Sequence, residues 1–269
     1  MVRGLCAAGA TAKFVLSPRN AAKAAKLAAE FPKTARVAEN NQEVVDSCQC
    51  VILAVLPKQA DAVLSELTFR EGQQILSVIA TVGLERLRKL AAPATDCVVC
   101  VPLPAVAKRQ GATIALPERP FAKAICSALG AYVPVENEVQ FKLLQTITAL
   151  MGDFYKRQLT AQQWLESNGI PKEQSAAWVG AVFKAIAADS AVAGPETLQH
   201  LVGEQTPGGF NEMVWRDQEA DGAYEALRHS LDSAHYRYCT GQVDTALAPA
   251  RKRARSDGLV QAASAESKT

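Results

Sequence analysis

Two short segments of the sequence carry residue types that suit the binding of anions. Thr206-Pro207-Gly208-Gly209 precedes a predicted helix that contains Asn211. Backbone N–H groups at the start of a helix, behind a glycine turn, suit a carboxylate or a phosphate. An ordinary helix-breaking turn explains the same residues nearly as well. This segment is therefore either an anion-binding site or a turn that only ends one helix and begins the next.

The second segment is the turn Ser17-Pro18-Arg19-Asn20, which follows a predicted strand. The turn contains no acidic residue, so the Arg19 guanidinium is available to pair bidentately with a phosphate group. The alternative is a surface turn in which Asn20 caps the following helix. Both interpretations stay open from the sequence.

The cysteine and histidine residues do not indicate metal chemistry. Cys97 and Cys100 have the spacing of a metal-binding pair, but they lie in an apolar run typical of a strand. Residues three apart on a strand point to opposite faces, so the two thiols cannot readily grip one metal. His229 and His235 are six apart on a predicted helix, and His200 is isolated. We expect no metal site.

The composition favours a globular protein without a broad nucleic-acid or membrane surface. Its 269 residues include 49% hydrophobic and 21% charged side chains, with 29 basic against 27 acidic groups. The near balance of charge argues against nucleic-acid binding. The longest apolar run, residues 50–57, is too short to span a bilayer. Seven cysteines without a secretion signal indicate reduced thiols in a cytoplasmic protein.

The Arg19 turn lies in the first part of the chain, where strands and helices are predicted to alternate. Short apolar runs alternate there with amphipathic stretches, a pattern typical of βαβ units. Strands are predicted at residues 13–16, 36–38, 50–55, 74–79, 97–101, 113–116 and 131–135. Helices are predicted at residues 21–31, 41–48, 59–67, 84–90 and 122–129.

From about residue 138 onward the strand signal disappears. Helical stretches are predicted at residues 138–167, 172–193, 196–204 and 212–241, separated by Gly and Pro. The last residues contain a basic cluster at 251–255, which could be a nuclear localisation signal, within a composition typical of disorder. The predicted domains are an α/β domain at 1–137, a helical domain at 138–241 and a disordered basic tail at 242–269.

The order of these elements resembles the pyrroline-5-carboxylate reductase family over residues 3–238. Residues 51–57 resemble the family's V-I-L-A-V-K-P strand and turn, and residues 77–82 take the place of its I-S-I-A-A-G-V. Residues 99–104 stand for V-R-V-M-P-N-T-P, and the T-A-L at 148–150 introduces the active-site helix. The Thr206 segment matches the family's S/T-P-G-G turn. No single segment is specific for the family, but the order of the segments along the chain is.

The resemblance implies a Rossmann-like doubly wound parallel sheet, followed by an all-helical domain, with NADPH as the cofactor. The glycine-rich turn G-x-G-x-x-G that follows the first strand of such domains is absent, and so is the family's first strand. A sheet without that central strand has two neighbouring edges unpaired. An incomplete start of the chain and a reorganised domain are both open explanations.

For the cofactor, the resemblance implies that Arg19 meets the 2′-phosphate of NADP, since an NAD site would have an acidic residue at this turn. Backbone and apolar contacts are expected from the turns that follow the next strands, although these residues alone are typical of a core. The expected cofactor-binding residues are Ser17, Arg19, Asn20, Ala54, Val55, Pro57, Ile79, Ala80, Thr81 and Pro102.

The family reaction is hydride transfer from NADPH to the C=N carbon of a cyclic imino acid, as in proline biosynthesis. By resemblance the catalytic residues would be Thr206, Asn211 and Asp153. The substrate-binding residues would be Thr148, Pro207, Gly208 and Gly209.

The sequence departs from the family at several polar positions. The family's S-G-S-G-P-A is replaced by residues 151–156, and the hydroxyls after P-G-G are replaced by Phe210 and Asn211. Leu103 replaces the Asn of the M-P-N turn. Asp153 or Tyr155 could handle a proton, but Asp153 would repel a bound carboxylate. The resemblance therefore leaves the substrate open.

Three functions stay open. The first is an NADPH-dependent reductase that acts on a small imino acid and dimerises through its helical domain. The second is a catalytically inactive, cofactor-free paralogue that serves oligomerisation or the regulation of a partner. The third is a hydroxyacid dehydrogenase, which needs a Lys or His facing the nicotinamide, and Lys142, Lys156 and Lys184 are its candidates.

Overall fold

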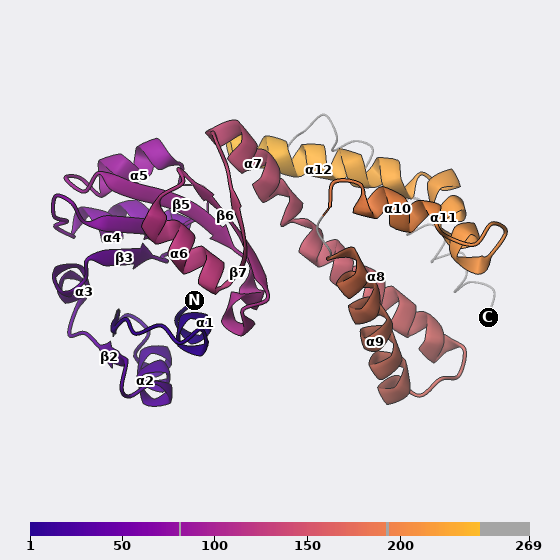
Figure 1. Ribbon diagram of the computed structural model, residues 1–269, viewed down its shortest axis with the longest axis horizontal. Helices are drawn as coiled ribbons and strands as arrows, with labels where there is room; N and C mark the ends of the chain where they lie inside the picture. Colours follow the sequence, from indigo (N-terminus) through magenta and orange to yellow (C-terminus); the bar gives the residue numbers. More distant parts are fainter. Residues whose placement is uncertain (81, 192–193, 243–269) are drawn as a thin grey trace, which may run out of the picture. The chain divides into compact units, whose positions relative to one another are not determined.

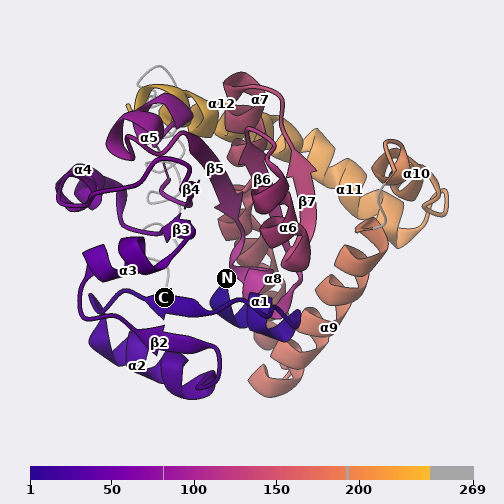
Figure 2. The same ribbon diagram turned by 60° about the vertical axis from the view of Figure 1, so that its left-hand side comes forward.

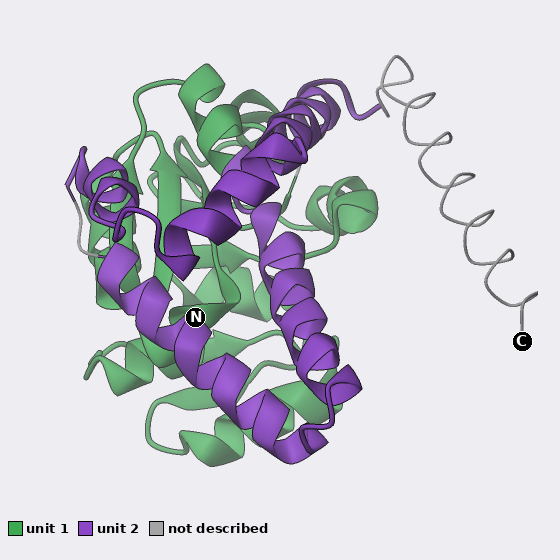
Figure 3. Ribbon diagram, turned by 90° about the vertical axis from the view of Figure 1, so that its right-hand side faces the viewer, with its two compact units in different colours: residues 1–145 green, residues 146–269 purple. Residues whose placement is uncertain are grey.

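The computed structural model describes residues 1–80, 82–191 and 194–242, in two compact units. The first unit is Met1–Gln145 and the second begins at Thr146 (Figure 3). The predicted domain boundary lay after residue 137. The two boundaries differ because helix α7 (Glu138–Ile147) places Phe141 in the core of the first unit. Residue 81 and the basic cluster at 251–255 lie outside the described residues.

The first unit has a Rossmann-like fold with two separate groups of strands. One sheet pairs β1 (Phe14–Leu16) with β2 (Ala35–Val37). The other sheet has five strands in the order β3 (Cys50–Leu53), β4 (Gln74–Ser77), β5 (Asp96–Pro102), β6 (Gly111–Leu116) and β7 (Gly130–Pro134). Figures 1 and 2 show β2 and its neighbouring helix apart from the strands of the second sheet.

The sequence predicted a parallel sheet, but the five-stranded sheet contains one antiparallel pair. β6 runs antiparallel to β5, while the other neighbouring strands are parallel. The reason is the connection after β5, which consists of little more than the short 3-10 helix η2 (Pro104–Lys108). A parallel pair needs a crossover of a dozen or more residues, whereas a short connection suffices for an antiparallel pair.

Helices cover the five-stranded sheet on both faces, and β5 shows this through the alternation of its side chains. Cys97 packs in one buried cluster with Leu64 and Leu87, whereas Cys100 packs in another with Ala122. The two thiols thus lie on opposite faces of the strand. No group of three or more metal-ligating side chains occurs within the described part of the chain.

Asparagine caps fix the starts of two helices of the first unit. The Asn20 Oδ1 atom accepts from the N–H of Lys23 at 3.1 Å, and the Asn40 Oδ1 atom accepts from the N–H of Glu43 at 2.9 Å. Such caps satisfy N–H groups that have no partner within the helix. The helices of this unit are α1 (Val2–Ala7), α2 (Ala21–Glu30), α3 (Asn41–Ser47), η1 (Pro57–Gln59), α4 (Ala60–Ser65), α5 (Leu84–Leu90), α6 (Pro120–Ala128) and α7.

The second unit is helical throughout its described residues. Its helices are α8 (Leu150–Ser167), α9 (Lys172–Ser190), α10 (Thr197–Gly203), α11 (Phe210–Ala220) and α12 (Ala223–Thr240). The predicted stretch at 212–241 is two helices because Gly222 adopts a left-handed φ of 75° between them. No helix in the described ranges is long and apolar enough to cross a membrane.

Candidate functional site

The carboxyl ends of four strands of the first unit converge on one cavity of about 600 Å³. Ser17 follows β1, Ala54 follows β3, Val78 follows β4 and Pro102 ends β5, and all of them line this cavity. In open α/β sheets, ligands bind in the crevice outside the carboxyl ends of the strands. This cavity is therefore the candidate cofactor site of the first unit.

The turn after β1 places Ser17 in the lining of this cavity, and Arg19 follows two residues further along. The Ser17 hydroxyl donates to Asn41 Oδ1 at 2.7 Å and accepts from the N–H of Arg19 at 3.3 Å. The Arg19 guanidinium is exposed and donates to the side-chain oxygen of Gln59 in η1. Arg19 is thus available to an anion, while Asn20 serves as the helix cap that the alternative interpretation predicted.

The other predicted cofactor residues divide into exposed and core positions. Ala54 and Ala80 are exposed at the ends of β3 and β4. Ile79 is buried and belongs to the main apolar cluster, against which Val55 is also packed. Pro57 begins η1, where its fixed φ and missing N–H suit the first helical position. Ile79 therefore contributes to the core more than to a ligand surface.

Helix α1 contributes lining that the sequence did not single out. Met1, Val2 and Arg3 line the cavity. A Cβ atom on Gly4 would lie 2.1 Å from the carbonyl oxygen of Val106 in η2. Only glycine therefore lets α1 pack this closely against η2, and this contact keeps the helix beside the strand ends.

In the second unit, Asp153 lines a cavity of about 250 Å³ between α8 and α12. The Asp153 carboxylate accepts from Arg157 Nε at 2.7 Å, and Arg157 and Ser230 line the same cavity. The Arg157 charge offsets the repulsion that Asp153 alone would exert on an anionic ligand. Sequence reasoning missed Arg157, although its i,i+4 spacing from Asp153 was the available signal. Thr148 is half-buried just before α8.

The Thr206–Gly209 turn stands directly before α11, as predicted, but its glycine N–H is occupied. Gly208 has a left-handed φ of 72°, and its N–H donates to Glu212 Oε2 at 2.6 Å. That N–H, followed by the Arg216 guanidinium, lowers the pKa of Glu212. The protein's own carboxylate thus takes the position that was predicted for a ligand.

The two remaining polar side chains of this turn are exposed. The Asn211 side-chain amide donates to Gln205 Oε1 at 3.0 Å, and the Thr206 carbonyl accepts from the N–H of Gly209 at 2.8 Å.

Comparisons with known proteins agree with this architecture. Residues 1–81 match the family model described as NADP oxidoreductase, coenzyme F420-dependent. The chain matches no curated protein sequence. A pyrroline-5-carboxylate reductase from Coxiella burnetii has a TM-score of 0.76 at 20% identity, over 88% of this chain and 92% of that chain.

Two further solved structures extend the comparison. Pyrroline carboxylate reductase from Plasmodium falciparum with NADP bound has a TM-score of 0.71 at 15% identity, over 88% of this chain and 90% of that chain. A reductive aminase from Aspergillus terreus in complex with NADPH has a TM-score of 0.52 at 16% identity, over 85% of this chain and 82% of that chain. The predicted resemblance is confirmed, and the chain has the fold of the pyrroline-5-carboxylate reductases.

Proposed function

We propose that the protein is an NADPH-dependent reductase that transfers hydride to the C=N bond of a small cyclic imino acid. The observation that carries the proposal is the cavity at the carboxyl ends of β1, β3, β4 and β5, with the Arg19 turn at its edge. The similar reductases and the aminase named above, two of them described with NADP or NADPH bound, support a nicotinamide cofactor. A role in proline biosynthesis within the cytoplasm is part of the same proposal.

The preference for NADPH over NADH rests on the Arg19 turn. Residues 17–20 contain no acidic side chain that would accept from both ribose hydroxyls, and Arg19 is exposed beside the Ser17 hydroxyl. A guanidinium and a hydroxyl suit a 2′-phosphate. The adenosine end of NADPH therefore fits the residues present. When bound, the cofactor supplies a hydride to the imine carbon.

The proposed substrate-binding residues lie in the second unit. We propose that Asn211 and the Thr206 hydroxyl bind the substrate carboxylate, because the Gly208 N–H already donates to Glu212. The Asp153 carboxylate would hold the proton of the iminium nitrogen, with its charge balanced by Arg157. Because Arg157 already pairs with Asp153, the positive charge of the iminium is offset by the carboxylate of the substrate itself.

The cofactor proposal is tested by titrating the purified chain with NADPH and NADH and following nucleotide fluorescence. Arg19→Ala should raise the Kd for NADPH about tenfold, equivalent to roughly 1.4 kcal/mol, and leave the Kd for NADH unchanged. Arg88→Ala is the matched control, because it removes the same charge from an exposed position on α5. Equal losses with both variants would refute the assignment of Arg19.

The substrate proposal is tested by comparing a cyclic imine that carries a carboxylate with the same ring lacking it. NADPH oxidation should be faster with the carboxylate, and Asn211→Ala should remove that difference mainly through KM. Absence of binding by either nucleotide would favour the second candidate function, a catalytically inactive paralogue that acts in oligomerisation or regulation. That candidate is supported by the Glu212 carboxylate at the Gly208 N–H.

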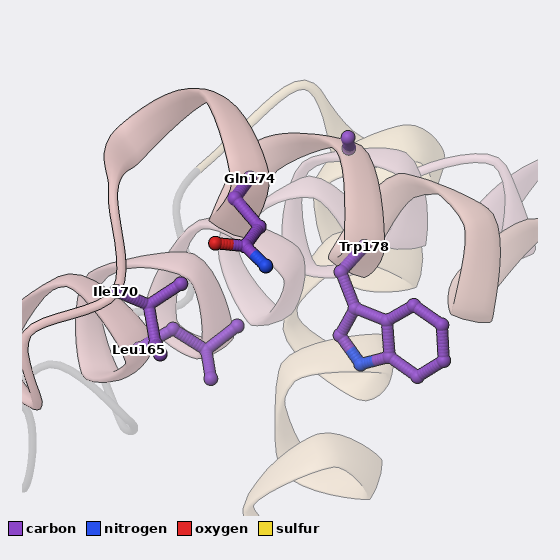
Figure 4. A pocket seen from close by; sticks show the side chains of 5 residues that line it. Leu165, Ile170, Gln174 and Trp178 are labelled. Atoms are coloured by element: carbon purple, nitrogen blue, oxygen red, sulfur yellow. The ribbon is translucent and has the colours of Figure 1, made fainter.

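We also propose that the protein forms a homodimer through its helical unit. The supporting observation is a set of large exposed apolar side chains, among them Trp164 on α8, Trp178 on α9 and Ile170 in the connection between the two helices. Figure 4 shows Ile170 and Trp178 beside a pocket of about 480 Å³ that Leu165 also lines. Contiguous apolar surfaces of this kind mark interaction sites in soluble proteins.

A further inference from the structure

The Arg19 guanidinium is held by a neutral side chain. Arg19 Nη2 donates to Gln59 Oε1, and among the described residues no ion pair joins Arg19 to a carboxylate. Arg36 on the neighbouring strand β2 pairs instead with the carboxylate of Glu43. A carboxylate offsets the charge of an arginine, whereas a neutral amide leaves that charge in place. The positive charge of Arg19 is therefore open to an anion.

A single hydrogen bond to Gln59 leaves the guanidinium able to bind a phosphate in the usual way. The guanidinium carries five N–H groups in one rigid plane. They form two forks, one made by Nε and Nη2 and the other by Nη1 and Nη2, and Nη2 contributes one N–H to each. Whichever of these two N–H groups Gln59 accepts, the other fork stays complete for bidentate pairing with a phosphate. The contact thus orients Arg19 without using up its phosphate-binding geometry.

The backbone of Gln59 is anchored in the core of the first unit. Gln59 is the last residue of η1 and directly precedes α4, and its N–H donates to the carbonyl of Leu56 at 2.9 Å. In α4, Ala60 and Leu64 are buried in the main apolar cluster. Gln59 itself is half-buried, whereas Arg19 is exposed. The acceptor oxygen therefore lies on a more rigid segment than the guanidinium that it holds.

The backbone of Arg19 is fixed separately from its side chain. The Arg19 N–H donates to Ser17 Oγ at 3.3 Å, and this hydroxyl donates to Asn41 Oδ1 at 2.7 Å. The next residue, Asn20, caps α2. The long arginine side chain is thus confined at its backbone by this network and at its guanidinium by Gln59. A side chain that is ordered before binding loses less conformational freedom when a ligand arrives, which raises the affinity.

We propose that Gln59 is a positioning residue for Arg19, and that the pair determines the preference for an adenosine 2′-phosphate over a 2′-hydroxyl. Gln59 acts through Arg19 and does not itself contact the phosphate. The inference rests on the proposed NADPH-dependent function. It adds a residue that lies 40 positions along the chain from Arg19 and outside the Ser17–Asn20 turn.

The test is isothermal titration calorimetry of the full chain with adenosine 2′,5′-bisphosphate and with AMP, which isolates the 2′-phosphate from the rest of the cofactor. Gln59→Glu keeps the length of the side chain but places a carboxylate against Arg19. The Kd for the bisphosphate should rise about tenfold, because the carboxylate pairs with the guanidinium and repels the phosphate, and the Kd for AMP should stay unchanged. Gln110→Glu is the matched control, since it adds the same charge at another glutamine of the first unit that is exposed.

A double-mutant cycle separates positioning from an independent contact. Gln59→Ala removes the acceptor and should raise the Kd for the bisphosphate about fivefold, because the Arg19 side chain is then no longer confined. In an Arg19→Ala background the same substitution should have no further effect. Urea unfolding of each variant measures the stability of the fold. A contact that serves stability alone would lower the free energy of unfolding without changing the ratio of the two Kd values.

The outcomes distinguish this inference from the proposed function. Binding of the bisphosphate that is weakened by Arg19→Ala but by neither Gln59 variant would overturn the role of Gln59 alone. An equal rise in the Kd for AMP, or additive effects in the double variant, would overturn it as well. A wild-type chain that binds neither NADPH nor the bisphosphate would remove the inference together with the proposed function. Binding of the bisphosphate that depends on Gln59, without oxidation of NADPH by cyclic imines, would support the inference and count against the proposed reductase.

Discussion

The two units of the molecule bury their apolar side chains to very different degrees. In the first unit, Ile75, Leu76 and Leu87 are 0% exposed, within the apolar clusters on the two faces of the sheet. Among the described residues of the second unit, Val179 is the only buried hydrophobic side chain, whereas Trp178 is 64% exposed. The first unit therefore contains its own core, while the helical unit has apolar faces that are left for another surface.

The difference follows from the elements that each unit uses. A sheet covered by helices on both faces closes its apolar residues inside three layers. A hairpin of two long helices such as α8 and α9 can bury only the narrow stripe along their contact, so further apolar side chains stay outside. These exposed apolar side chains are the physical ground for the proposed homodimer.

The largest effect is expected from the core of the first unit. Leu76→Ala should lower the free energy of unfolding by about 2–5 kcal/mol, because it removes buried methyl groups and leaves a cavity. Leu198→Ala, in the helical unit, changes the same residue type at 64% exposure and should cost less than about 0.5 kcal/mol. Urea unfolding at one protein concentration measures both. Similar losses would contradict the contrast between the units.

A second experiment addresses association. Trp178→Glu places a charge on the exposed apolar face of α9 and should weaken self-association at least tenfold, since large aromatic side chains dominate interface energies at about 2 kcal/mol or more. Analytical ultracentrifugation at several concentrations measures the effect. Leu56→Glu is the matched control in the first unit, where Leu56 is 61% exposed. A monomeric wild-type chain, or equal weakening by both variants, would remove the proposed homodimer.

The sequence predicted the first unit well because its signals are local. One of the two interpretations of the Arg19 turn placed Asn20 at a helix start, and the structure confirms this cap. The direction of β6 was missed because strand periodicity carries no information on which way a strand runs. The predicted helical stretch at 138–167 is two helices, α7 and α8, and the burial of Phe141 from α7 depends on tertiary packing.

Of the residues named from the sequence for the cofactor, Ser17, Ala54 and Pro102 line the candidate cavity, whereas the contacts made by the polar side chains were not foreseen. The Arg19 turn lies at a strand end, as the pattern predicted, and Thr206–Gly209 precedes a helix. The sequence interpretation left out the contacts among the protein's own side chains. Glu212 occupies the Gly208 N–H and Arg157 pairs with Asp153, and in both cases the two residues are four positions apart in the sequence.

The smallest expected effect concerns the hydrogen bond from the Gly208 N–H to the Glu212 carboxylate in the helical unit. The pKa of Glu212 is lowered in the folded state by the Gly208 N–H and by Arg216. A depressed pKa stabilises the fold above the ordinary pKa of a glutamate, about 4.3, and this contribution is lost as the pH falls through the lower folded value. Glu212→Gln should therefore flatten the decline in urea stability of the wild-type protein below pH 4.3.

The matched control is Glu219→Gln, near the other end of α11, which should keep the decline seen in the wild type. If the two variants behave alike, Glu212 does not hold the glycine turn.

The same Glu212→Gln variant also tests whether the Thr206–Gly209 turn binds the substrate carboxylate. A neutral amide at the Gly208 N–H repels an anion less than a carboxylate does, so the variant should bind an imino-acid carboxylate more tightly if the turn is a substrate site. Unchanged KM together with a flattened pH profile would assign the turn to the stability of α11 alone.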